Sequence, residues 1–87
     1  MGMTRLISSD ETIATTLRAD GKLIEFAWKG THAIDRVHEH WEVDTEWWSE
    51  LGHVWREYYA VTTKDGLLCV LFHDLLNNEW HIERIYD

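Results

Sequence analysis

The sequence predicts an all-β domain of about six antiparallel strands, which form a small barrel or a rolled sheet. Two observations lead to this prediction. The 87 residues include no proline, and short apolar segments alternate with turn signals such as Asp-Gly at 20–21 and 65–66. Asp-Gly between strand-like segments favours a tight hairpin, because both turn positions require a positive φ. Bends in antiparallel strands of this kind help a sheet to curl.

A chain of this length forms one domain, which we place at residues 12–87 after a partly ordered segment at 1–11. Two three-stranded meanders are joined by the connector 44–53, and we expect one short helical turn near 45–51. Gly52 suits the left-handed position after that turn. The predicted strands are 12–18, 23–28, 31–43, 54–63, 67–74 and 79–87.

Turn type fixes the expected register of the first hairpin. A two-residue turn at 20–21 pairs Leu17 with Ile24 and Thr15 with Phe26, and it places all four side chains on one face. Turn type and hydrophobic alternation agree, and together they specify a register.

The equivalent turn at 65–66 pairs Val61 with Val70. Strand 67–74 is then apolar on both faces, which a sheet with one solvated face would not show. Its inward residues would be Leu68, Val70 and Phe72, and its outward residues Leu67, Cys69 and Leu71. Either the chain itself covers the outward face, through Leu6-Ile7 or the Trp47-Trp48 turn, or a second copy or partner protein does.

Two positions break the regular alternation. Ile34 and Val37 are three residues apart, so they share a face only if a bulge lies near Asp35-Arg36. Trp80 and Ile82 would join the core only if the loop across 75–78 had an odd number of residues, and we expect such a loop.

The aromatic segment 41–59 holds four of the six tryptophans, and we expect the core to condense around it. Trp47 or Trp48 would anchor the connector to the sheet. Alternatively, Trp47, Trp48, Arg56 and Tyr58 would form a binding site for a small ligand or a cation.

Composition limits the class of function. Sixteen acidic and eight basic residues give a net charge of −8, which disfavours direct nucleic-acid binding. No apolar run is long enough to cross a membrane. The single Cys69 lies in the apolar run LLCVLF, which fits a buried thiol in the cytoplasm.

The sequence contains no catalytic signature and no phosphate-binding loop, so we expect no enzyme activity and no cofactor. His38 and His40 alternate along one predicted strand and could share a face. A metal site at this pair needs further ligands, and Glu42 or His81 could provide one only if strands three and six adjoin. A metal site is therefore our third hypothesis.

Several aromatic and turn motifs follow one another in a recognisable order. They are Trp41, Trp47-Trp48, Arg56-Glu57-Tyr58-Tyr59, Asp65-Gly66, Leu71-Phe72-His73-Asp74, Trp80 and Tyr86-Asp87, preceded by Phe26-Ala27-Trp28-Lys29-Gly30. This order resembles a small bacterial domain of unknown function, similar to the C-terminal segment of the inactive Y-family polymerase-like subunit of bacterial mutasomes. The resemblance covers residues 12–87, although Glu57 and His73 replace an Asp and an Arg of the pattern.

The resemblance implies no catalytic residues. It implies a module that binds another protein, in DNA-damage tolerance. We therefore predict a non-enzymatic protein-interaction module that contacts another protein or a second copy of itself. The candidate binding residues are Trp47, Trp48, Arg56, Tyr58 and Leu71.

Overall fold

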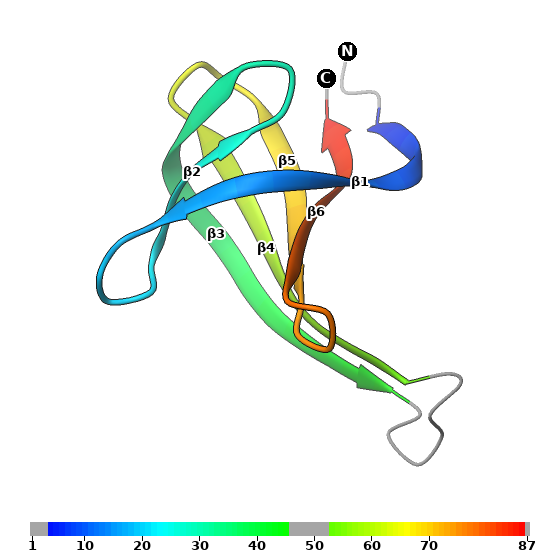
Figure 1. Ribbon diagram of the computed structural model, residues 1–87. Coiled ribbons are helices and arrows are strands. Elements are labelled where there is room, and N and C mark those ends of the chain that lie inside the picture. The colour runs from blue at the N-terminus through cyan, green and yellow to red at the C-terminus, as the bar shows by residue number, and fades with distance from the viewer. Residues whose placement is uncertain (1–3, 46–52, 87) are drawn as a thin grey trace.

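Six antiparallel strands form a closed barrel in the computed structural model, which describes residues 4–45 and 53–86. The strands follow one another around the barrel in chain order, and the first pairs with the last (Figure 1). They are β1 Thr4–Leu17, β2 Leu23–Ala27, β3 Thr31–Thr45, β4 Val54–Thr63, β5 Leu68–Asp74 and β6 Glu79–Tyr86. The predicted fold class is confirmed.

Two long strands, β1 and β3, close the barrel because each pairs with different neighbours along its length. β1 pairs with β2 through residues 14–17 and with β6 through residues 4–6 and 11–13. β3 pairs with β2 through residues 31–33 and with β4 through residues within 34–45. Figure 1 shows β1 crossing the barrel from β6 to β2. Closure of this kind removes the free sheet edges that invite aggregation.

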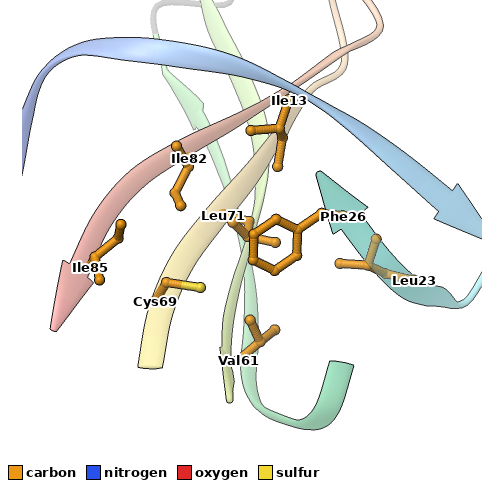
Figure 2. Packing of buried hydrophobic residues seen from close by; sticks show 8 residues of the cluster. All are labelled: Ile13, Leu23, Phe26, Val61, Cys69, Leu71, Ile82 and Ile85. Carbon is orange, nitrogen blue, oxygen red and sulfur yellow. The ribbon is translucent and has the colours of Figure 1, made fainter. Parts of the chain in front are cut away.

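The barrel interior is packed with aliphatic side chains around the ring of Phe26 (Figure 2). Ile34 and Val37 of β3 are partly buried and pack against this cluster. Burial of such side chains contributes roughly 1.5–3 kcal/mol each. The buried members of the cluster are Ile13, Leu23, Phe26, Val61, Cys69, Leu71, Ile82 and Ile85.

The core does not condense around the aromatic segment 41–59, and that prediction is wrong for the described residues. Trp41 and Trp55 are 38% and 37% exposed. β3 and β4 pair directly and extend beyond the barrel as a long hairpin (Figure 1). The connector therefore joins two paired strands, and the helical turn predicted near 45–51 lies outside the described residues.

Two hairpins have loops of three residues. The amide of Gly21 donates to the carbonyl of Arg18 at 2.8 Å, and that of Gly66 donates to Thr63 at 3.0 Å. Both glycines have a positive φ, 88° and 95° respectively. This is a type I turn followed by a left-handed glycine, a common three-residue hairpin loop. The two-residue turns predicted at these sites are one residue too short.

In the first hairpin, the longer loop shifts the register close to the turn. Thr15 lies opposite Phe26 as predicted, but Leu17 lies opposite Leu23 and not opposite Ile24. Leu23 therefore enters the core, while Leu17 and Ile24 are exposed.

In the β4–β5 hairpin, the extra loop residue exchanges the two faces of β5. Val61 lies opposite Cys69 and not opposite Val70. Because side chains alternate along a strand, a shift of one residue turns every side chain to the other face. Leu71, which we expected on the outer face, is 0% exposed in the barrel core, and Phe72 lies on the outer face.

The β5–β6 loop has an even number of residues, 75–78, so the odd-length prediction is wrong. Ile82 nevertheless lies in the core as predicted, because its partner Leu71 also points inward. Trp80 is partly buried against the same cluster.

β3 contains two irregularities. The register shifts between Ile34 and Arg36, which confirms the predicted bulge, and both Ile34 and Val37 pack against the core. A second shift between Val37 and Glu39 was not predicted. It reverses the faces of the rest of the strand.

Candidate interaction surface

Four rings form a ladder across the outward side of strands β3 to β6. Trp41 lies opposite Tyr58, Tyr58 opposite Phe72, and Phe72 opposite His81. The ring centroids are 5.3, 5.3 and 4.9 Å apart in that order, with interplanar angles of 5°, 40° and 17°. Such cross-strand ring pairs stabilise a sheet. We call these four residues, together with Arg56, the outer aromatic face.

Arg56 covers the middle of the outer aromatic face. Its guanidinium carbon lies 4.3 Å from the centroid of the Phe72 ring, and its Nη1 donates to the Tyr58 hydroxyl at 3.2 Å. A cation over the face of a ring is attracted by the ring quadrupole. The protein's own cation therefore occupies the position over Phe72 that a bound cation would take in an aromatic cage.

The centre of this face is buried, although it lies outside the barrel. Tyr58, Val70 and Phe72 form a second buried cluster, against which Val43, Ala60 and Tyr86 pack. At its margins, Trp41 and Leu68 are each 38% exposed. The outer aromatic face thus has an apolar centre and two exposed apolar side chains beside it.

A carboxylate and histidine group lies at one end of this face. Ligand atoms of Asp74, Glu79 and His81 lie within 4.8 Å of one another. The Asp74 carboxylate already accepts hydrogen bonds from the amide and side chain of Asn77, at 3.3 and 2.9 Å. Burial would raise the pKa of Asp74, but these hydrogen bonds and the charge of Arg56 hold it below its usual value. Asp74 therefore caps the β5–β6 loop through these hydrogen bonds.

The two histidines of the metal hypothesis lie on opposite faces of β3, contrary to our expectation. The second bulge separates them. His38 Nε2 bonds with Thr62 Oγ1 at 3.0 Å, whereas His40 Nε2 bonds with Glu57 at 3.0 Å and its ring stacks on Tyr59. β3 pairs with β2 and β4, so β6 cannot complete a site there.

A second series of rings lies on the inward side of the same strands. Centroids of His40 and Tyr59 are 4.5 Å apart, those of Tyr59 and Trp80 are 5.3 Å apart, and those of Trp80 and His73 are 4.5 Å apart. Burial and a hydrogen bond to Glu57 raise the pKa of Tyr59 to about 12. Burial opposes ionisation of Glu57, but hydrogen bonds from Tyr59 and His40 lower its pKa. Tyr59 therefore stays a hydrogen-bond donor and Glu57 an acceptor near neutral pH.

The five candidate binding residues lie in different parts of the protein. Arg56 and Tyr58 lie together on the outer aromatic face. Leu71 lies in the core, so its assignment as a surface residue is wrong. Trp47 and Trp48 lie outside the described residues. Sequence reasoning missed three members of the face, which only the cross-strand register brings together: Trp41, Phe72 and His81.

Comparison of the chain with protein-family models, curated proteins and solved structures found no match. The resemblance to the mutasome-associated domain stays a prediction. Among the residues that the structure describes, no helix has the length and apolar character needed to cross a membrane.

Proposed function

We propose that this domain is a protein-interaction module that binds a partner protein through the outer aromatic face. The observation that carries the proposal is the ladder of ring contacts, two stacked and one tilted, with an arginine over it, on the side of the strands that faces away from the barrel core. In a barrel strand, the side chains that face the solvent are normally polar. Tyrosine, tryptophan, phenylalanine and arginine are the residues enriched at the centres of protein interfaces.

Trp41 is the expected anchor for the partner. Its ring is 38% exposed yet stacks on Tyr58 at an angle of 5°, so its position is set before binding. A side chain ordered in advance loses less entropy on binding, which favours affinity.

Charge favours a partner with a positive net charge over a second copy of this chain. The net charge of −8 makes two copies repel, whereas it attracts a basic surface. The partner's docking segment would combine an apolar or aromatic side chain for the exposed ring with nearby lysine or arginine. A partner in DNA-damage tolerance would agree with the resemblance noted in the sequence.

A matched pair of tryptophan substitutions tests this function. Trp41 and Trp55 have nearly equal exposure, 38% and 37%, but lie on opposite faces of the β3–β4 hairpin. Immobilised parent, Trp41→Ser and Trp55→Ser proteins are used to capture proteins from the native lysate, with quantification by mass spectrometry. The captured protein is then purified and its affinity for each variant is measured by calorimetry.

We expect Trp41→Ser to weaken the affinity for the partner at least tenfold, which is about 1.4 kcal/mol, and Trp55→Ser to leave it nearly unchanged. Circular dichroism checks that both variants are folded. Equal loss in both variants, or a partner insensitive to Trp41, would refute the docking surface. A parent that runs as a dimer and becomes monomeric on Trp41→Ser would replace the basic partner with a second copy.

A further inference from the structure

A pocket opens where strands β2 and β3 separate. Their ladder has three residue pairs and ends at Glu25 opposite Ala33, so Leu23 and Ile24 have no partner on β3. Residues 34–37 of β3 pair with β4 instead. The space between the two strands has a volume of about 410 Å³, within the range of roughly 300–1,000 Å³ typical of small-molecule sites.

Bulges and apolar side chains shape this pocket. The register shifts at Leu17 of β1 and after Ile34 of β3 lie beside it, and bulges are frequent next to binding sites. Leu23 lines the pocket and belongs to the buried core, and Ile34 and Val37 pack on that core. Part of the lining therefore belongs to the barrel core, although polar atoms make up more of the pocket surface.

The remaining lining is mainly cationic. Arg18, Lys22 and Arg36 line the pocket, together with Asp35. Arg18 is paired with Asp20 at 3.2 Å, but both side chains are more than half exposed, so that pair is weak. Among the described residues, the side chains of Lys22 and Arg36 have no ion-pair partner.

This concentration of positive charge contrasts with the rest of the chain. The protein has sixteen acidic and eight basic residues, and three of those eight basic residues line this one pocket.

We propose that this pocket binds a small organic anion. The carboxylate or phosphate group of this anion lies within reach of Lys22 and Arg36. The apolar part of the anion rests on Leu23, Ile34 and Val37. The arginine fork can donate two parallel hydrogen bonds to either anionic group, and the lysine adds a charge. This site is separate from the outer aromatic face, which lies on strands β3 to β6, and it does not depend on the proposed partner.

Nuclear magnetic resonance titration of the full chain tests the pocket. The probes are hexanoate, hexyl phosphate and hexylammonium, which share an apolar chain and differ in the head group. We expect saturable amide shifts confined to residues 18–24 and 34–37 with at least one of the two anions. The anion that binds more tightly identifies the head group.

Charge-matched variants locate the contact. Arg36→Gln is expected to weaken anion binding at least tenfold and Lys22→Gln several-fold, while Arg36→Lys retains part of it. Lys64→Gln, which makes the same change outside the pocket, is the control and is expected to bind like the parent. Dispersed amide signals show that each variant is folded.

Three results would overturn the proposal. The first is that hexylammonium shifts the same amides with equal affinity. The second is that neither anion gives a saturable shift, and the third is that Arg36→Gln binds the anion like the parent.

Discussion

Truncation of two leucines on β5 would test which face of that strand lies inside the barrel. Leu71 is 0% exposed and packs in the core, whereas Leu68 is 38% exposed on the opposite face. The register expected from a two-residue turn would reverse these roles. Leu71→Ala and Leu68→Ala make the same chemical change on one strand, so each serves as the control for the other.

The structure gives a large difference between the two variants. Truncating a fully buried leucine costs about 2–5 kcal/mol, because transfer free energy is lost and a cavity remains. A partly exposed leucine at the margin is expected to cost less than about 1 kcal/mol. The total stability of an 87-residue domain is about 4–13 kcal/mol, so the Leu71→Ala change removes a large share of it.

Thermal and urea unfolding measure this difference. At roughly 2 cal/mol/K of unfolding entropy per residue, a loss of about 3 kcal/mol lowers the Tm by about 16 °C. We expect that shift for Leu71→Ala and a shift below about 6 °C for Leu68→Ala. The urea midpoints should rank the two variants in the same order. Unchanged m values would show that both variants unfold in the same way.

The opposite ranking would refute the reasoning. If Leu68→Ala lowered the Tm more than Leu71→Ala, β5 would point the other way and the outer aromatic face would not exist as described. Equal losses would show that both faces of β5 are covered to the same extent.

Two further predictions follow from the same hairpin. Burial and the charge of Asp65 raise the pKa of Cys69 from 9.0 to about 12, so its thiol stays neutral in the folded state and ionises first in the unfolded state. Stability should therefore fall as the pH rises from about 9 toward 12, by about 3 kcal/mol at pH 11 from this group. Urea unfolding at pH 7 to 11 should show a smaller fall in Cys69→Ala, and a parallel fall would contradict the assignment. Gly66 has a φ of 95° with open space around its Cβ position, so Gly66→Ala should cost about 1–2 kcal/mol from backbone strain alone. Gly66→Asn should cost less, because asparagine tolerates this conformation, and equal unfolding midpoints for the two variants would contradict that cause.

The order and number of strands could be predicted because the turn signals are local. Asp-Gly at 65–66 marks a hairpin whatever the rest of the chain does, and the spacing of Ile34 and Val37 reveals a bulge directly. Loop length could not be predicted as well. The same Asp-Gly pair fits a two-residue turn and the end of a three-residue loop, and these differ by one residue in register.

The one-residue shift in register had its largest effect on β5, because the two faces of this strand are almost equally apolar. On β2, hydrophobic alternation still marks Phe26 as an inward residue, and its pairing with Thr15 was predicted correctly. On β5, the pattern of Leu68, Val70 and Phe72 is as apolar as that of Cys69 and Leu71. When both faces are apolar, hydrophobicity cannot choose between the two registers.

The outer aromatic face depends on an irregularity that no sequence pattern indicated. Val37 points inward, so a regular strand would also turn Trp41 inward, four residues later. The second bulge, between Val37 and Glu39, adds one residue and turns Trp41 outward, where it stacks on Tyr58. The same bulge sends His40 inward, toward Tyr59, and so separates it from His38. One extra residue in β3 therefore both removes the predicted histidine pair and completes the ring ladder proposed for binding.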